Sequence, residues 1–168
     1  MLVIDNKSTQ DEMWIYLPAL KKTRRIVSTE KGRSFMSSEF SNADMSSPTL
    51  SDFVNKHTDG SGLNNQWIIE SKPVSEAKTE EYGYSRKISY ISMDKYQIEK
   101  MEFYNYDNEL FKSIEIKSIY PLKDGKFIIR NMIANNLLTN RKSEIALSNI
   151  AAGTIVEDSY FTIQNLKR

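Results

Sequence analysis

The sequence predicts a mainly β fold of the α+β kind, in which a curved antiparallel sheet forms an incomplete β-barrel with short helices as a lid or plug. Runs of β-branched and aromatic residues recur between turn signals from Met13 onward, which is typical of strands in a meander. The segments Asp107–Glu109 and Lys123–Lys126 hold residues that tolerate tight turns, and each stands between two apolar runs. We therefore expect a hairpin at each of them.

Eight strands are expected from these runs, and that number in one chain favours a strongly curved sheet or an open barrel. Their expected bounds are Glu12–Leu17, Thr23–Ser28, Gln66–Ser71, Arg86–Met93, Ile98–Tyr106, Phe111–Tyr120, Phe127–Ile133 and Lys142–Ser148.

Some of these strands carry apolar residues on both faces, as Ile88 and Ile91 do in one strand and Phe127 and Ile128 do in another. Such strands are covered on two sides. The pattern fits a half-open barrel with an apolar cavity, and it also fits a solid core. The seven methionines, Met101 and Met132 among them, are adaptable enough to line a pocket or to fill gaps in a core.

Two segments are expected outside the sheet. Residues Ser41–Asn65 are rich in Ser, Asn, Asp and Gly, which predicts a lid or long loop with a short helix at Thr49–Val54. Within it, Asp59–Gly62 breaks any helix and is expected to be mobile. Near the end, Asp158–Leu166 predicts a short helix that covers a sheet edge or the barrel mouth.

Length and composition restrict the class of protein. A chain of 168 residues fits a single domain over 1–168, with one core. Lys and Arg total 23 against 22 Asp and Glu, and a net charge of +1 makes nucleic acid an unsuitable partner. No run is long and apolar enough for a transmembrane segment, and Met1–Asp5 lacks the features of a signal peptide.

The sequence offers little for catalysis. Its single histidine, His57, is expected to be a solvated loop residue, and there is no cysteine for a metal site. Glu80 and Glu81 stand beside Lys78 in what we interpret as a solvated connection rather than a pair of catalytic carboxylates. We therefore expect no enzyme, no cofactor and no metal.

A local group of basic residues, Lys21–Lys22, Arg24–Arg25 and Lys31–Arg33, follows the first expected strand. Such a patch could meet an anionic lipid head or an acidic partner. It could equally be an ordinary polar face, since positive side chains at a sheet edge also prevent unwanted strand pairing.

Two stretches, Met13–Ile26 and Ser34–Met45, carry a resemblance to a known family. They follow the order W-x-Y-L-P, a pair of arginines, and then S-F-M-G-S-D-F-S-x-x-D-L, with Ser37 in place of the Gly and Glu39 in place of the first Asp. In this the chain resembles the LolA-like outer membrane lipoprotein-sorting proteins. Members of that family normally begin earlier, so the resemblance implies that the N-terminal part of the fold is missing here.

The resemblance implies an open barrel wrapped round helices, with an apolar cavity that receives acyl chains in the periplasm. The expected function is that of a carrier or chaperone for the acyl chain of a lipid or lipoprotein, in outer-membrane lipoprotein sorting or lipid transport. An inner-membrane lipid transporter is a candidate partner. The alternative is a non-enzymatic interaction module that docks on an envelope lipid transporter through its curved sheet or an open edge.

Later pieces of the chain also resemble the family, namely Trp67–Glu70, Glu102–Tyr104 and Phe161–Thr162. Two groups of candidate residues come from the motif, from these pieces and from the expected strands. The candidates for the apolar cavity are Trp14, Tyr16, Leu17, Phe35, Met36, Phe40, Trp67, Ile69, Tyr90 and Phe103. The candidates for tethering a lid to the sheet are Arg24, Arg25, Glu39 and Asp44, with either arginine pairing with either acid.

Overall fold

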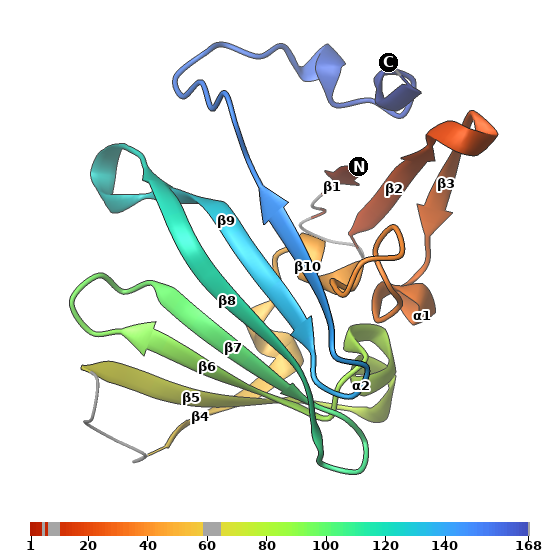
Figure 1. The fold of residues 1–168 in the computed structure, drawn as a ribbon. Helices are drawn as coiled ribbons and strands as arrows, with labels where there is room; N and C mark the ends of the chain where they lie inside the picture. The colour runs from red at the N-terminus through yellow and green to blue at the C-terminus, as the bar shows by residue number, and fades with distance from the viewer. Residues whose placement is uncertain (5, 7–10, 59–64, 168) are drawn as a thin grey trace.

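The computed structural model describes residues 1–4, 6, 11–58 and 65–167, and the expected mobility of Asp59–Gly62 concerns residues outside these ranges. The protein is mainly β, with a seven-stranded antiparallel sheet and a separate three-stranded sheet. Figure 1 shows the larger sheet as a twisted, curved fan, and its first and last strands do not pair with each other. The prediction of an incomplete barrel with a few short helices is confirmed.

The seven-stranded sheet is a meander in which each strand pairs with its neighbours in the sequence. Six expected strands are confirmed here, with ends shifted by up to three residues, and both expected hairpins are present. The strands are β4 Phe53–Thr58, β5 Gln66–Pro73, β6 Arg86–Ser92, β7 Ile98–Tyr104, β8 Leu110–Pro121, β9 Phe127–Asn136 and β10 Arg141–Ala146.

The small sheet consists of β1 (Leu2–Ile4), β2 (Glu12–Leu17) and β3 (Lys22–Ile26), with β2 in the middle. Met13, Ile15 and Ile26 point to one side of it and form a small core of their own. The expected strands β2 and β3 are confirmed, whereas β1 was not expected.

The expected C-terminal helix over Asp158–Leu166 is wrong. The chain forms two separate 3₁₀ turns there, η5 (Asp158–Tyr160) and η6 (Asn165–Lys167). Turn η6 contacts β2 and β3, so this segment covers the small sheet rather than an edge of the large one. Polar and β-branched residues between the two turns leave too short an apolar repeat to sustain a longer helix.

The expected helix at Thr49–Val54 is also wrong. Only Leu50–Asp52 is helical, as the 3₁₀ turn η3, and Phe53 begins strand β4. His57 lies in that strand opposite Ile69, so it is an exposed residue of an edge strand and not of a loop. The backbone hydrogen bonds that β4 gains from β5 outweigh the local preference of its polar residues for turns.

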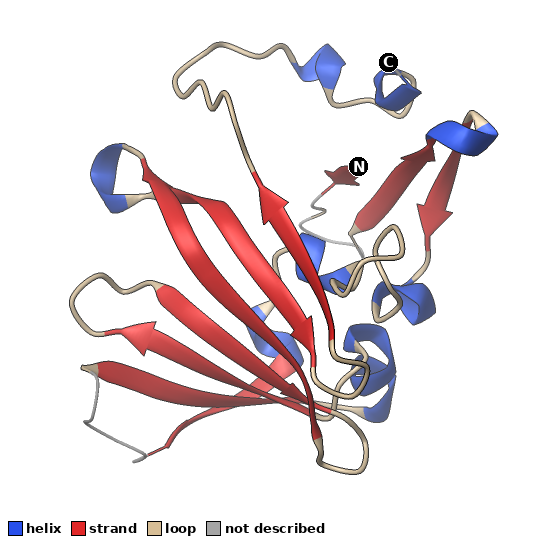
Figure 2. Cartoon of the chain, viewed as in Figure 1, coloured by secondary structure: helices blue, strands red, loops and turns tan. Residues whose placement is uncertain are grey.

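Two α-helices that were not expected from the sequence, α1 (Ser28–Lys31) and α2 (Glu76–Tyr82), lie with the 3₁₀ turn η2 (Ala43–Met45) on one side of the large sheet (Figure 2). The Oγ atom of Ser75 accepts a hydrogen bond from the backbone N–H of Lys78 at 3.3 Å and so caps α2. Gly83 ends the helix with a φ of 76°, a conformation that suits glycine.

The main core lies between these helical segments and the large sheet. Phe40, with 0% of its surface exposed, packs there with Phe103 and Ile114 from β7 and β8. Burial of a phenylalanine stabilises a fold by about 2 kcal/mol. The motif segment Ser34–Met45 therefore acts as a plug, because its central aromatic residue is embedded under the sheet.

Candidate functional site

The plug segment is shaped by a tight turn. Phe35 donates its backbone N–H to the carbonyl of Phe40 at 2.7 Å, and Ser34 and Ser41 form an isolated β-bridge. Ser37, at the tip, has a φ of 62°, in the left-handed region that glycine adopts most readily. This is the position at which the lipoprotein-sorting motif has Gly, so Ser37 adopts a conformation that glycine would adopt more readily.

Both acidic residues of the plug are tied to the large sheet. Asp44 lies 2.6 Å from the Nζ atom of Lys112 on β8, and both side chains are buried. Glu39 pairs with Arg141 of β10 at 3.0 Å and accepts a hydrogen bond from the Nδ2 atom of Asn136 at 2.8 Å. These contacts attach the plug to β8, to the end of β9 and to the start of β10.

The two arginines of the motif do not take part in this attachment, which corrects the expected pairing with Glu39 or Asp44. Arg24 forms its ion pair with Glu30, and Arg25 lies 3.4 Å from Glu12. Both arginines are on β3 of the small sheet, which places them beside the acids of β2 and of helix α1.

A close crossing of two glycines holds the helical side together. A Cβ atom added to Gly32 would lie 2.8 Å from the Cα atom of Gly83, so the two backbones are in direct contact. The crossing places Lys31 beside Glu81, with 2.7 Å between Nζ and Oε1, and both side chains are at most 10% exposed. The interpretation of Glu81 as solvated is therefore wrong, and Lys31 does not belong to an exposed basic patch.

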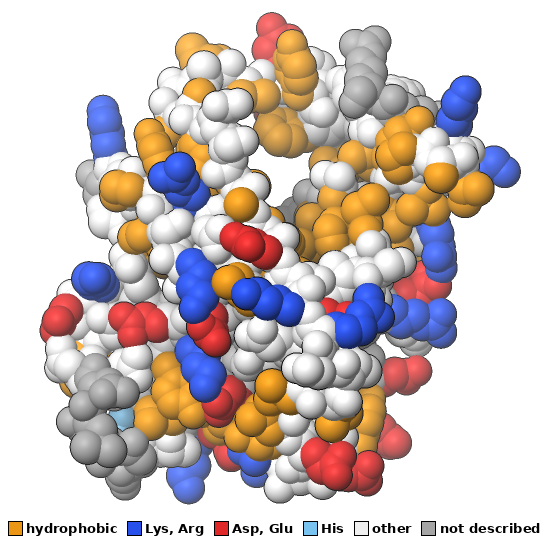
Figure 3. Space-filling view, in the orientation of Figure 1, with side chains coloured by type: hydrophobic (Ala, Val, Ile, Leu, Met, Phe, Trp, Pro, Cys, Tyr) orange, Lys and Arg blue, Asp and Glu red, His pale blue; other side chains and the backbone are white. Residues whose placement is uncertain are grey.

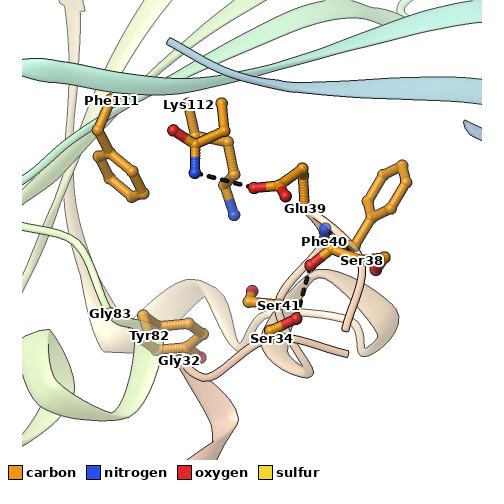
Figure 4. A pocket seen from close by; sticks show the side chains of 11 residues that line it. Gly32, Ser34, Ser38, Glu39, Phe40, Ser41, Tyr82, Gly83, Phe111 and Lys112 are labelled. Atoms are coloured by element: carbon orange, nitrogen blue, oxygen red, sulfur yellow. Dashed lines mark hydrogen bonds between the residues drawn. The ribbon is translucent and has the colours of Figure 1, made fainter. Parts of the chain in front are cut away.

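A small polar pocket of about 150 Å³ lies between the plug, the glycine crossing and the sheet (Figure 4). Glu39 from the plug and Lys112 from β8 both line it. Figure 4 shows Ser34 turned toward Ser38, whose carbonyl accepts a hydrogen bond from the Ser34 hydroxyl at 2.6 Å. Glu39 and Lys112 each already have an ion-pair partner, Arg141 and Asp44. The pocket therefore belongs to the attachment of the plug.

A larger hollow of about 250 Å³ lies between the large sheet and the segment 43–48. Its walls are mainly apolar and come from four neighbouring strands, from the segment 43–48 and from the end of α2. The lining residues are Ala43, Asp44, Ser46, Ser47, Pro48, Tyr82, Tyr84, Lys87, Ile98, Met101, Phe103, Ile114, Ile129 and Met132.

Lys87 and Tyr84 are two of the lining residues that carry polar groups into this mainly apolar space. Burial lowers the pKa of Lys87 below its usual 10.5, and the neighbouring charge of Lys112 acts in the same direction while Asp44 opposes it. Burial likewise raises the pKa of the Tyr84 hydroxyl, with a further contribution from Asp44. Lys87 therefore carries its charge at a cost, and Tyr84 stays a hydrogen-bond donor.

The structure brings only one of the ten cavity candidates to the wall of this hollow, Phe103. Trp67 and Ile69 lie on the same face of the sheet as the hollow. Ser71 is the cross-strand partner of Lys87, and alternate residues of a strand, here Trp67, Ile69 and Ser71, point to the same side. Tyr90 is on the opposite face, where its hydroxyl donates to Glu102 at 2.8 Å. Burial and this hydrogen bond raise the pKa of Tyr90 to about 12.

The remaining cavity candidates lie in or near the plug and the small sheet. Phe40 is enclosed in the core, Phe35 packs against the cores of both sheets, and Met36 is exposed at the turn. Trp14, Tyr16 and Leu17 are half-buried on β2. Figure 3 shows apolar side chains gathered over this small sheet, where the molecule is hollowed between it and the C-terminal segment.

Nothing in the sequence distinguishes Lys87 or Tyr84 as site residues. Their positions follow from the alternation of β6 and from the end of α2, a helix that was not expected. Two residues could be anticipated from composition, since Met101 and Met132 were among the methionines considered as adaptable pocket walls, and both line the hollow.

Within the described part of the chain there is no group of His, Cys, Asp or Glu side chains that could hold a metal ion. No helix among the same residues is long and apolar enough to cross a membrane.

A family model described as "Uncharacterized protein" matches residues 1–168. The chain belongs to this family. No curated protein matches the sequence. Similar solved structures do exist, and they bear on the resemblance found in the motif.

One is a domain from Vibrio parahaemolyticus described as an outer membrane lipoprotein-sorting protein, with 27% identity and a TM-score of 0.85 over 99% of this chain and 70% of that one. Another is a DUF1329 family protein from Desulfovibrio piger, with 25% identity and a TM-score of 0.78 over 95% of this chain and 66% of that one. A LolA superfamily protein from Nitrosomonas europaea shares the fold at 14% identity, with a TM-score of 0.60 over 92% of this chain and 67% of that one. The resemblance to LolA-like lipoprotein-sorting proteins is confirmed.

Proposed function

We propose that this protein is a non-covalent carrier that binds the acyl chain of a lipid or lipoprotein in the hollow under its large sheet. The observation that carries the proposal is the hollow itself, whose walls include Met101, Ile114 and Met132 from three adjacent strands. Apolar walls favour a hydrocarbon chain, and unbranched methionines adapt to chains of different shape. Its volume of about 250 Å³ is near the lower end for small-molecule sites, about 300–1,000 Å³, so it suits one chain or part of one.

The likeness to the lipoprotein-sorting domain supports the same function and a location in the periplasm, with an inner-membrane lipid transporter as the donor or receptor of the cargo. No covalent step is proposed. Release would require the plug to loosen, since the segment 43–48 forms one wall of the hollow.

A docking module for an envelope transporter is the second candidate, and the outer surface of the protein favours it. The sheet has two unclosed edges, β4 and β10, which can accept a strand from a partner. Large apolar side chains are exposed after β9 and toward the C-terminus, namely Leu137, Leu138, Leu147, Ile155, Val156, Tyr160 and Phe161.

Native mass spectrometry of protein purified without detergent, followed by organic extraction, separates the two functions. The carrier function predicts co-purified or added acyl lipid at one molecule per protein. Ile129→Trp should abolish binding, because Ile129 lines the hollow and is 36% exposed. Ile133→Trp, on the same strand and outside the hollow, is the matched control. Lipid-free protein that also ignores added lipid would leave the docking module as the better account.

A further inference from the structure

The hollow contains two hydrogen-bond donors that the protein itself does not use. The ammonium group of Lys87 and the hydroxyl group of Tyr84 both line it. Among the residues that the structure describes, neither group has a hydrogen-bond acceptor or an ion-pair partner, and neither is one of the fully enclosed unpaired polar atoms, so both face the open space of the hollow. A donor that faces a mainly apolar hollow and has no protein partner is available to a ligand that carries an acceptor.

The side chains that carry the two donors share aromatic neighbours. The Nζ atom of Lys87 is 5.4 Å from the ring centroid of Phe53, and the Tyr84 ring stacks on the same Phe53 with 6.3 Å between centroids. Lys87 also pairs across the strands with Phe103, whose ring meets that of Tyr84 edge-on at 5.2 Å. The two side chains therefore have the same two aromatic neighbours, Phe53 and Phe103, beside the hollow.

Asp44, the acid whose charge acts on Lys87, already forms an ion pair with Lys112. Oδ2 of Asp44 accepts a hydrogen bond from Lys112 at 2.6 Å and another from the backbone N–H of Ser41 at 2.7 Å. Asp44 and Lys87 are the charged residues that line the hollow, and with the charge of Asp44 balanced by Lys112 the site keeps one net positive charge. An anion would neutralise it.

We propose that the hollow binds a single-chain amphiphile with an anionic head, a fatty carboxylate, whose head is held by Lys87 and Tyr84 and whose chain lies against Met101, Ile114 and Met132. This inference rests on the carrier function and specifies its cargo. A carboxylate has two oxygens that can accept hydrogen bonds from both donors, and charge-assisted hydrogen bonds are about twice as strong as neutral ones. An esterified or amide-linked acyl chain has no free carboxylate, so the geometry favours a free fatty acid over a protein-linked chain.

Isothermal titration with tail-matched probes tests the head group. Dodecanoate should bind the full chain about 10-fold to 100-fold more tightly than dodecanol. Lys87→Met should remove most of that difference and leave dodecanol binding within about 3-fold, because methionine keeps the apolar stem. Lys87→Arg should restore the preference. Tyr84→Phe should weaken the binding of dodecanoate by a smaller factor than Lys87→Met does.

Lys100→Met is the matched control, since Lys100 lies on the opposite face of the sheet and pairs with Glu102 at 2.6 Å. Its affinity for dodecanoate should be unchanged. Thermal unfolding of each variant verifies that the fold is retained.

Each result decides one claim. If dodecanoate and dodecanol bind equally and Lys87→Met changes neither affinity, the proposal of an anionic head group is wrong, whereas the carrier function still holds. Binding of neither would overturn the carrier function and the inference together. Acetate binding as tight as that of dodecanoate would show a site for small anions, which would overturn the amphiphile.

Discussion

Two groups of charged side chains lie beneath the large sheet, and they differ in whether every charge has a partner. In the first, at the glycine crossing, Lys31 pairs with Glu81 at 2.7 Å, and Lys78 lies 2.9 Å from both Glu81 and Asp52. Two positive and two negative charges cancel there. In the second, at the hollow, Asp44 is paired with Lys112 and Lys87 is left over.

The pKa values of the lysines reflect this difference. Burial alone would lower the pKa of Lys78, but its hydrogen bonds to Asp52 and Glu81 outweigh burial and raise it above 10.5. Burial lowers the pKa of Lys87, for which the described residues supply no such bond. A cluster with complete pairing holds the fold together, whereas a cluster with one spare charge is suited to a ligand.

The largest effect is expected from breaking the neutral cluster. Glu81→Ala removes a buried carboxylate and leaves Lys31, with a side chain 10% exposed, as an unpaired buried charge. The free energy of unfolding should fall by about 3–5 kcal/mol. Urea unfolding followed by circular dichroism measures it. A loss below about 1 kcal/mol would mean that water reaches Lys31 easily and that the cluster is not structural.

The next effect concerns the crossing that creates this cluster. Gly32→Ala places a Cβ atom 2.8 Å from the Cα atom of Gly83, so the two backbones must separate. We expect a destabilisation of about 1–3 kcal/mol, because overpacked contacts cost that much. Thr29→Ala, at an exposed position in α1, is the control. If both variants unfold at the same denaturant concentration, the crossing is looser than the structure implies.

Replacing the spare lysine should have a small effect of opposite sign. Lys87→Met removes an uncompensated charge from an apolar wall and keeps a side chain of similar length. The ligand-free protein should gain about 1 kcal/mol of stability. Thermal unfolding against the wild-type chain tests this. A clear destabilisation would indicate that Lys87 has a structural partner, and the contrast between the two clusters would be lost.

The smallest effect is a pH dependence of that stability difference. The pKa of Lys87 is lowered in the folded state, so between that value and 10.5 the unfolded chain binds more protons. The wild-type protein should therefore gain stability relative to Lys87→Met as pH rises through this window, and the advantage of the variant should shrink. Urea unfolding of both proteins at a series of pH values measures the difference. A constant difference would contradict the lowered pKa.

Most of the large sheet could be predicted because the alternation and the turn residues of a meander are local signals. The hairpin at Asp107–Glu109 is an example, since Asn108 adopts the φ of 61° that its residue type tolerates. β4 was missed because Phe53–Thr58 has a polar edge-strand composition and is held by pairing with β5. A long-range partner decides such a segment, and one sequence does not reveal it.

The site was only partly predictable for a similar reason. The motif identified the plug, and Glu39 and Asp44 do reach the sheet, but their partners Arg141 and Lys112 come from strands far along the chain. In the sequence, Lys87 looks like one more lysine of a half-buried strand. Lys87 stands out only because no described residue near it accepts its hydrogen bonds. That follows from how the chain packs, and the sequence does not show it.

The most direct test of the carrier function is a crystal structure of the protein with ω-bromododecanoate, located by the anomalous signal of bromine. A carrier for fatty carboxylates should show one bromine site among Met101, Ile114 and Met132, with the carboxylate beside Lys87 and Tyr84. A fully occupied ligand elsewhere, for example over the small sheet, with the hollow closed by its own side chains, would contradict it.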